Sequence, residues 1–237
     1  MRSIRGHQVS KEAMDLNPSL TSSIYERLRG DILSGRWQPG TKLGIEALRD
    51  HYASGATPLR EALNRLVAEA WVSHLDQRGF TVAPVSDAAL RELADTRIWV
   101  ETLALSKAMQ HHTPEWEERV VLALHRLSKT PRSLSSERYE ENPAWEKLHR
   151  AFHFSLIEPC GSRWLLAFCE QLYEQAYRYR QLAVKTAYLR RDELGEHRAI
   201  VDAIAVGDSA AASAALTAHY TRTARIILHG DAPDGAA

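Results

Sequence analysis

TPLREALNRLVAEAWVSHLDQRGFTVAPV, residues 57–85, changes its apolar periodicity halfway along. The first half places apolar residues three or four positions apart, which predicts a helix that begins at Thr57 and Pro58, a capping residue followed by a proline suited to the first turn. The second half alternates apolar and polar residues on either side of a turn at residues 76–79. This alternation around a glycine-containing turn predicts a β-hairpin.

Two shorter helical patterns precede this stretch. SLTSSIYERLRGDILSGRW, residues 19–37, places Ile24, Leu28 and Ile32 on one helical face. A second short helix is expected over Ile45–Tyr52. Three short helices closed by a hairpin are the layout of a winged helix-turn-helix, in which the third helix enters a DNA major groove.

The chain after residue 85 shows a helical apolar pattern throughout. Helices are expected near residues 86–109, 114–129, 137–158, 161–186, 190–206 and 209–228. Three tryptophans are expected to pack in the core of this region: Trp99, Trp145 and Trp164. The predicted fold is therefore mostly α, with an N-terminal winged helix-turn-helix and a C-terminal antiparallel all-α bundle. The expected segments are a disordered tail (1–18), a DNA-binding domain (19–85), a helical effector-binding and dimerisation domain (86–229) and a second disordered tail (230–237).

The composition restricts the location and the partners. Thirty Lys and Arg residues against thirty Asp and Glu residues give a net charge of zero, so we expect no indiscriminate coating of nucleic acid or of a membrane. The two cysteines, Cys160 and Cys169, are too few for a disulfide framework and fit a reducing compartment. Because the sequence shows neither a secretory signal nor a long apolar run, a cytoplasmic location without membrane contact is expected.

Four of the eleven histidines fall at metal-compatible positions. His149 and His153, in LHRAFHFSLI, are one helical turn apart, so both side chains project from the same face. His197 and His219 lie at nearly equal distances from the break at residues 207–208, so two antiparallel helices would bring them to the same height. A single histidine in a bundle is more often a packed or surface residue, but imidazoles at matching positions favour zinc, nickel or copper.

Three segments of the N-terminal region resemble one family. ILSGRWQPGTKL (32–43), TPLREALNRLVAEAWV (57–72) and QRGFTVAPV (77–85) are similar to the DNA-binding domain of GntR-type bacterial transcription regulators. The chain departs from the family pattern at residues 55–56, where Gly-Ala replaces the usual Ser-Arg, and at Glu46, where many members carry Arg. The resemblance implies a head that binds double-stranded operator DNA.

Five residues are available to contact DNA on this interpretation: Lys42, Arg49, Thr57, Arg60 and Arg78. A guanidinium at the start of the recognition helix, such as that of Arg60, can contact guanine O6 and N7 together, whereas Lys and Thr more often bind phosphates. The alternative is that Arg60 and Arg65 form surface ion pairs with nearby glutamates of the same helix.

The bundle segments FH..LI, EHRAIVDAI..GD...A and HY resemble the FCD effector domain of the FadR branch of these regulators. In that domain a metal is commonly held by one Asp and three His. His153, His197 and His219 match the three histidines, and His149 stands at the usual aspartate position. The resemblance therefore implies a divalent transition metal, zinc or nickel first, in an all-imidazole site that keeps the full positive charge of the ion.

The same resemblance implies an effector pocket beside the metal. Arg97 and Glu101 match an R-x-x-x-E pair at the family's pocket, and Arg163 replaces a common asparagine. A guanidinium beside the metal could bind the second end of a carboxylate effector. Without the family, Arg97 and Glu101 could equally form an ion pair on a solvated helix face.

We interpret the chain as a ligand-responsive transcriptional repressor and not as an enzyme. A homodimer is expected because one head reads only one half-site of a palindromic operator. A small carboxylate is expected to coordinate the metal, to alter helix packing and to change the spacing of the two heads. KL..EALR..Y..GATPLREAL most resembles a subgroup that includes a carbon-starvation-induced, glutarate-responsive regulator, which implies a glutarate-like effector.

Two other classes of function are compatible with the histidines. A metal-dependent hydrolase or lyase could use the cluster with water as the nucleophile, but the sequence shows no carboxylate base in a recognisable motif beside it. A helical scaffold with structural zinc is the other alternative. Neither class needs TPLREALNRL after a PGTKL turn, which favours the regulator.

Overall fold

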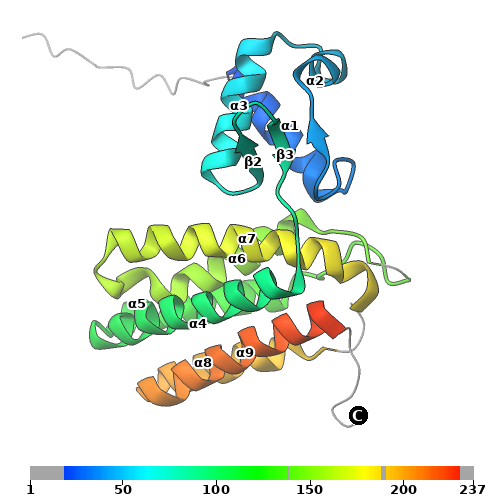
Figure 1. Cartoon of the computed structure of the whole chain (residues 1–237). Helices are drawn as coiled ribbons and strands as arrows, with labels where there is room; N and C mark the ends of the chain where they lie inside the picture. Colours follow the sequence, from blue (N-terminus) through cyan, green and yellow to red (C-terminus); the bar gives the residue numbers. More distant parts are fainter. Residues whose placement is uncertain (1–18, 138, 188–190, 230–237) are drawn as a thin grey trace, which may run out of the picture.

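The computed structural model describes residues 19–137, 139–187 and 191–229. The tails expected to be disordered, residues 1–18 and 230–237, lie outside these ranges. Figure 1 shows a small N-terminal unit, hereafter the head, next to a larger helical bundle. Among the described helices, none combines the length and apolar character needed to cross a membrane.

The head is a winged helix-turn-helix. Its helices are α1 (Leu20–Leu33), α2 (Ile45–Tyr52) and α3 (Ala56–Ala68). Its strands β1 (Lys42–Leu43), β2 (Val72–Leu75) and β3 (Gly79–Val82) form an antiparallel sheet in the order β1-β3-β2. The helices and the sheet share one core, in which Leu28, Leu63 and Trp71 are fully buried.

Two details of the head differ from the prediction. Helix α3 begins at Ala56 with Gly55 in the N-cap position, so Thr57 lies inside the first turn and is not the cap. Strand β1, formed by Lys42 and Leu43, was not predicted, because two residues are too few to show an alternating pattern. The β2–β3 hairpin agrees with the prediction.

The bundle consists, within the described ranges, of α4 (Asp87–Gln110), α5 (Pro114–Ser128), α6 (Pro143–Ile157), the short 3-10 helix η1 (Glu158–Cys160), α7 (Arg163–Ala187), α8 (Glu193–Ala205) and α9 (Ser209–His229). Ser86, Thr113 and Asn142 cap α4, α5 and α6, since each side chain accepts a hydrogen bond from a first-turn backbone N–H. These capping residues fix where the three helices begin.

One helix of the bundle is shorter than predicted. The helix expected over residues 137–158 begins only at Pro143, after the capping residue Asn142. Proline suits the first turn of a helix but disfavours helical backbone in the residue before it. Upstream, Ser133 and Glu141 pair in an isolated β-bridge, and none of the described residues between them is helical.

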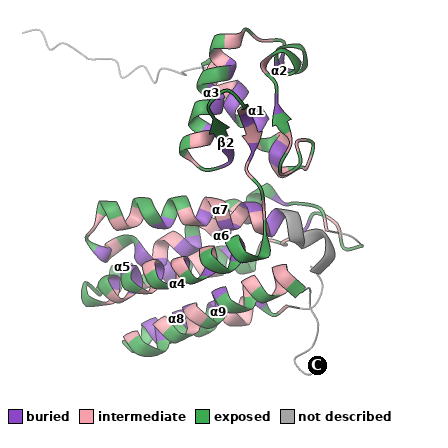
Figure 2. Cartoon of the chain, viewed as in Figure 1, coloured by how far each residue is buried: buried purple, intermediate pink, exposed green. Residues whose placement is uncertain are grey.

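The three bundle tryptophans differ in environment. Trp145 is buried as predicted, but Trp99 and Trp164 are 70% and 67% exposed, so their predicted core positions are wrong. Leu103 and Phe168, one turn further along α4 and α7, are also exposed. Figure 2 shows extensive exposed surface along these two helices. We call Trp99, Leu103, Trp164 and Phe168 the α4/α7 apolar face.

Helix α7 of the bundle forms non-covalent contacts with the head. Arg178 donates a hydrogen bond to the backbone carbonyl oxygen of Ala83, just after β3. Gln175 Nε2 donates to the backbone carbonyl oxygen of Glu69, the C-cap residue of α3, at 2.5 Å. Glu174 forms an ion pair with Arg29 of α1. The head therefore contacts the same helix that borders the site described next.

Candidate metal centre

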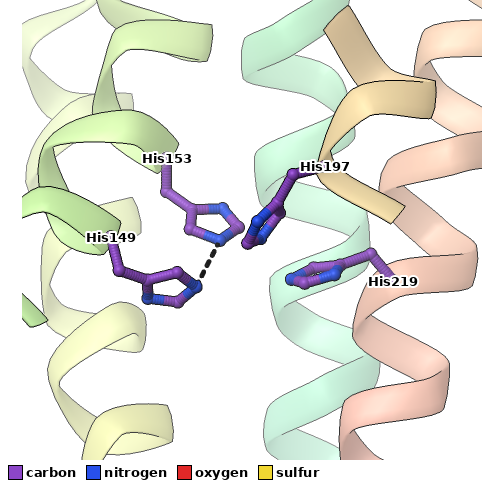
Figure 3. Close-up of side chains that lie close together, drawn as sticks. All are labelled: His149, His153, His197 and His219. Atoms are coloured by element: carbon purple, nitrogen blue, oxygen red, sulfur yellow. Dashed lines mark hydrogen bonds between the residues drawn. The ribbon is translucent and has the colours of Figure 1, made fainter. Parts of the chain in front are cut away.

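Four histidines from three helices meet inside the bundle. His149 and His153 come from α6, His197 from α8 and His219 from α9. One ring nitrogen of each lies within 4.8 Å of those of the other three, and all four residues are buried. Figure 3 shows the rings pointing toward one another. The turn between α8 and α9, where Gly207 has a φ of 73°, returns the chain as the spacing predicted.

The cluster fits a divalent transition-metal ion. The Nε2 atoms of His149 and His153 are 3.1 Å apart, a separation compatible with two nitrogen ligands about 2.1 Å from one ion. His197 Nε2 is buried without a hydrogen-bond partner among the described residues. Because an unpartnered buried polar atom is costly, a ligand at this nitrogen would remove a free-energy penalty. Imidazole donors suit zinc, nickel and copper alike.

The outer ring nitrogens of His153 and His219 face acceptors. His219 Nδ1 lies 2.8 Å from Glu196 Oε2. His153 Nδ1 lies 3.2 Å from Tyr220 Oη, whose hydroxyl donates to Glu101. Each ring can donate its Nδ1–H outward and keep the lone pair of its other nitrogen, and metal-binding histidines commonly have such partners.

The Nδ1 atom of His149 faces a guanidinium and a tyrosine hydroxyl. Its Nδ1 lies 2.9 Å from Arg180 Nη1 and 3.2 Å from Tyr173 Oη. An arginine can only donate, so His149 Nδ1 accepts and the neutral ring carries its proton on Nε2. Arg180 also pairs with Glu146 at 3.1 Å.

Burial keeps the four imidazoles neutral. Desolvation lowers the pKa of His197 to about 4. Desolvation also lowers the pKa values of the other three histidines well below 6.5. Nearby positive charge acts in the same direction, as Arg180 does on the pKa of His149. Since neutral imidazole is the form that binds metals, the cluster can act as a ligand set near neutral pH.

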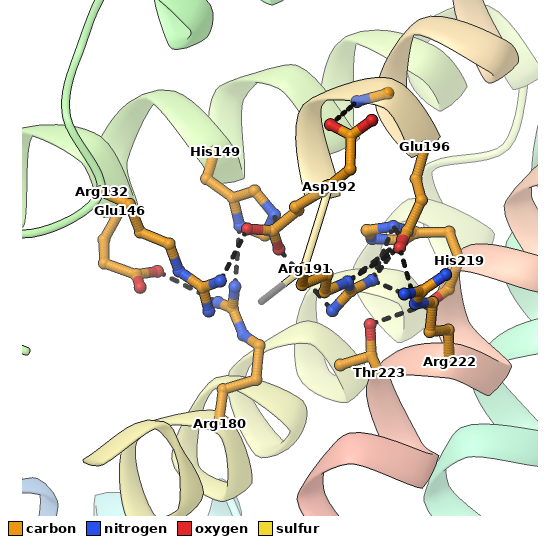
Figure 4. A network of polar contacts seen from close by, with 12 residues as sticks. Arg132, Glu146, His149, Arg180, Arg191, Asp192, Glu196, His219, Arg222 and Thr223 are labelled. Carbon is orange, nitrogen blue, oxygen red and sulfur yellow. Dashed lines mark hydrogen bonds and ion pairs between the residues drawn. The ribbon is translucent and has the colours of Figure 1, made fainter. Parts of the chain in front are cut away.

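Arginine–glutamate pairs surround the cluster. The pairs are Arg97–Glu101 (2.7 Å), Arg132–Glu193 (2.9 Å), Arg180–Glu146 (3.1 Å) and Arg191–Glu196 (2.5 Å). Figure 4 shows part of this network around His149 and His219. Because each of these arginines has a glutamate partner, the eight residues add no net charge. A divalent cation at the histidines would therefore keep its two positive charges uncompensated.

A cavity of about 340 Å³ opens beside His197. Arg132, Trp145, Arg191 and Glu193 contribute to its lining. Small-ligand sites have volumes of roughly this size or larger and combine apolar walls with a few polar groups. An anion in this cavity would meet two guanidinium groups close to the histidine cluster, together with the acidic residues Asp192 and Glu193 of the lining.

Arg97 and Glu101 lie beside the cluster and not on a solvated face. Both side chains are buried, and the guanidinium carbon lies 4.1 Å from the ring centre of Tyr220, whose hydroxyl contacts His153. Arg97 Nη2 is buried without a hydrogen-bond partner in the part of the chain described. This donor is available to a carboxylate oxygen.

Arg163 is not brought to the histidines. It is the first residue of α7, is exposed and lies with its guanidinium carbon 5.5 Å from the ring centre of Trp164. Tyr173, the α7 residue that contacts His149, follows ten positions later, which is about 15 Å along the helix axis. The predicted effector contact of Arg163 has no support from this position.

The charged residues around the cluster were not identified from the sequence: Arg132, Glu146, Arg180, Arg191, Glu193 and Glu196. They come from α6, α7, α8 and the segments before α6 and α8, so no single helical period relates them. A partial signal was present in DELGEH, residues 192–197. There Glu193 lies one turn before His197, on the same helix face.

The five candidate DNA contacts are all exposed on the head. Lys42 lies on β1, Arg49 on α2, Thr57 and Arg60 on the first turns of α3, and Arg78 in the turn between β2 and β3. Arg49 forms a surface ion pair with Glu46 at 2.9 Å. Arg60, in contrast, has no carboxylate in ion-pair contact within the described ranges, which leaves its guanidinium available.

Two family models match the chain. Residues 20–82 match the model described as bacterial regulatory proteins, gntR family. Residues 92–222 match the FCD domain. The first match covers the head and the second covers most of the bundle, including all four histidines.

Curated relatives match over most of their length. The HTH-type transcriptional repressor GlaR of Escherichia coli (strain K12) is 35% identical over 207 residues, which cover 86% of this chain and 93% of the relative. The HTH-type transcriptional regulator BphR of Paraburkholderia xenovorans (strain LB400) is 37% identical over 214 residues, covering 88% and 85%.

Solved structures share the fold. A protein described as a GntR transcriptional regulator from Rhodococcus sp. RHA1 superposes with a TM-score of 0.67 at 21% identity, covering 89% of this chain and 98% of that one. McbR of E. coli gives a TM-score of 0.66 at 22% identity, covering 90% and 98%. At these identities the similarity establishes the arrangement of head and bundle.

Proposed function

The chain belongs to the GntR family of bacterial regulatory proteins and carries an FCD domain, and from this we propose that it is a metal-dependent repressor that a small dicarboxylate releases from its operator. The gntR family is a family of bacterial regulatory proteins, and both curated relatives are HTH-type transcription regulators, so the chain is a regulator and not an enzyme. Repression is supported by the relative GlaR, which is named a repressor.

The metal and effector proposals depend mainly on two buried nitrogen atoms of this site. Within the described ranges, His197 Nε2 and Arg97 Nη2 both lack a hydrogen-bond partner. The imidazole nitrogen suits a cation, and the guanidinium suits an anion. Zinc or nickel, held by the histidines, would supply a position for one carboxylate oxygen, and Arg97 would bind another.

The charge of the site favours an anionic effector. The surrounding arginine–glutamate pairs are mutually neutralised, and four imidazoles add no charge. An anion that enters beside the ion therefore recovers Coulomb energy that it would not find in a site containing an aspartate ligand. A second carboxylate could reach Arg132 or Arg191 in the adjoining cavity. A glutarate-like acid is our first candidate, since the sequence resembles a glutarate-responsive subgroup.

The proposed homodimer would form through the α4/α7 apolar face. Trp99 and Leu103 are one turn apart on α4, Trp164 and Phe168 are one turn apart on α7, and all four are more than half exposed. The two helices pack against each other. Clustered exposed apolar side chains commonly mark protein–protein contacts. A second copy is the partner that reading a two-half-site operator requires.

Helix α7 supplies the proposed route from the site to DNA. Tyr173 and Arg180 contact the histidine cluster, while Gln175 and Arg178 contact the head. A ligand that binds better to one position of α7 would shift the population of head orientations. Two heads with altered spacing no longer fit successive major grooves.

Elemental analysis combined with operator binding tests this function. We expect about one zinc or nickel ion per chain in the wild-type protein and in H125A, whose histidine is exposed on α5. The metal should be lost in H197A and in H219A. Glutarate should release a selected operator fragment from metal-loaded protein only. Absence of stoichiometric metal, or equal release from metal-stripped protein, would overturn the proposal.

A further inference from the structure

His149 differs from the other clustered histidines in the direction of its hydrogen bonds. Arg180 Nη1 donates to its Nδ1 at 2.9 Å. The ring proton therefore lies on Nε2, the nitrogen that faces His153 Nε2 at 3.1 Å. A protonated ring nitrogen has no lone pair for a metal ion. With Arg180 in this position, His149 is not prepared to act as a ligand.

A directional chain of hydrogen bonds supports this proton placement. His149 Nε2–H donates to His153 Nε2, and His153 Nδ1–H donates to Tyr220 Oη at 3.2 Å. The Tyr220 hydroxyl donates to Glu101. Arg180 at one end can only donate, and the Glu101 carboxylate at the other end can only accept. Each donor in the chain thus has an acceptor, and His153 already has the tautomer that a metal ligand needs.

We propose that Arg180 controls whether His149 binds the metal. On this view the other three histidines form the permanent ligand set, and His149 joins when Arg180 leaves its Nδ1. The ring then loses its proton from Nε2 and regains one on Nδ1, with no change in net charge. Tyr173 Oη, 3.2 Å from Nδ1, is placed to accept the new hydrogen bond. This inference rests on the metal site proposed above.

An effector carboxylate is suited to displace Arg180. Arg180 Nη2 already lies 3.1 Å from Glu146 Oε2, so the side chain sits among anionic groups. A two-point bond between a guanidinium and a carboxylate is stronger than a single bond to a neutral imidazole. An effector that binds Arg180 would free His149 and raise the affinity of the protein for the metal. Because such coupling is reciprocal, the bound metal would raise the affinity for the effector by the same factor.

Arg191 provides a matched comparison at His219. Its Nη2 lies 3.1 Å from His219 Nδ1, similar to the contact of Arg180 with His149. Glu196 Oε2, however, lies 2.8 Å from the same nitrogen and accepts its proton. The other nitrogen of His219 therefore keeps its lone pair. Replacing Arg191 should change metal affinity only by removing a positive charge.

Zinc affinities of the full-length protein, measured by competition with a chromophoric chelator, test the inference. The proteins are wild type, R180M, H149A and R180M/H149A, with R191M and R191M/H149A as controls. Loss of a positive charge raises zinc affinity in every background. Release of His149 adds a further increase only where that histidine is present. The factor by which R180M raises zinc affinity should thus be at least about tenfold larger in the wild-type background than in the H149A background. A tenfold difference corresponds to about 1.4 kcal/mol.

The outcomes distinguish this inference from the proposed function. R191M should raise zinc affinity by the same factor in the wild-type and H149A backgrounds. H149A alone should lower zinc affinity far less than H197A does. Equal effects of R180M in both backgrounds would overturn the role of Arg180 while leaving the metal site intact. Absence of zinc binding in the wild type would overturn both. If circular dichroism shows that R180M does not fold, R180Q replaces it, because the glutamine amide oxygen can accept the Nδ1–H of His149. R180K keeps a hydrogen-bond donor, so its effect on zinc affinity should be the same with and without His149.

Discussion

Tyr173 and Arg178 lie five positions apart on α7 but contact different functional parts of the protein. Tyr173 Oη lies 3.2 Å from His149 Nδ1. Arg178 donates to the backbone carbonyl oxygen of Ala83, the residue that follows β3 of the head. Its guanidinium carbon also lies 5.9 Å from a ring centre of Trp71, in the core of the head. Less than two turns of one helix thus separate the histidine cluster from the head.

Arg178→Met should weaken communication between effector and operator. The substitution removes the hydrogen bond to Ala83 but keeps an unbranched side chain against Trp71. We expect the ratio of operator Kd values with and without glutarate to fall at least about fivefold, a typical allosteric coupling of about 1 kcal/mol. Metal content should not change. Fluorescence anisotropy with labelled operator measures the ratio.

Arg163→Met is the matched control for this prediction. It removes an exposed arginine from the same helix without touching the head. Its Kd ratio should equal that of the wild type. A normal ratio in Arg178→Met would show that α7 does not transmit the signal through this contact.

Arg60→Ala should lose about 1–3 kcal/mol of operator affinity, because a base-contacting guanidinium discriminates between sequences. Lys42→Ala should instead weaken binding to all DNA sequences. It should also reduce the slope of log Kd against log salt concentration by about 1, the value expected for the loss of one phosphate contact. Titrations of specific and unrelated DNA at several salt concentrations separate the two effects. An unchanged operator affinity in folded Arg60→Ala would contradict a recognition role for α3.

The two pairs of histidines in the cluster could be predicted from local geometry, and the resemblance to the FCD domain implied that the two pairs share one metal site. The interval between His149 and His153 is one turn of a single helix, and His197 and His219 lie about equally far from Gly207. Helix pitch and a short turn are sufficient to bring the two members of each pair together. The β2–β3 hairpin was predictable for the same reason, since its signal is an alternation around one turn.

The surroundings of the cluster depend on packing between distant segments. Arg180 reaches His149 across 31 positions, and Arg191 reaches His219 across 28. No short-range period encodes such distances. The exposed position of Trp99 was unpredictable for a related reason: an apolar residue shows the same pattern whether it meets its own core or a second chain.

Leu103→Asp should convert the protein to a monomer of 26.7 kDa. Leu103 is 51% exposed in the α4/α7 apolar face, so a carboxylate there costs the monomer little but would be buried unpaired in a dimer. Sedimentation equilibrium at micromolar concentration measures the mass. Val206→Asp is the control, because Val206 is 79% exposed outside this face and should leave the wild-type dimer intact. A wild-type monomer, or a dimer in Leu103→Asp, would contradict this interface.

The stability of the metal-free protein should fall as the pH drops below about 6.5. In the unfolded chain the histidines titrate near 6.5, whereas burial lowers the folded-state pKa of His197 to about 4 and those of its three neighbours well below 6.5. The unfolded chain therefore binds protons between about pH 6.5 and 4 that the folded protein excludes. Each such histidine lowers the free energy of unfolding by at most about 1.4 kcal/mol per pH unit in this window and contributes no slope above it. Urea unfolding of chelator-treated protein at several pH values measures the slope, which should persist in H125A and decrease in His153→Gln. A flat profile between about pH 7 and 5 would mean that the four imidazoles accept protons in the folded state, which is incompatible with their burial as a neutral cluster.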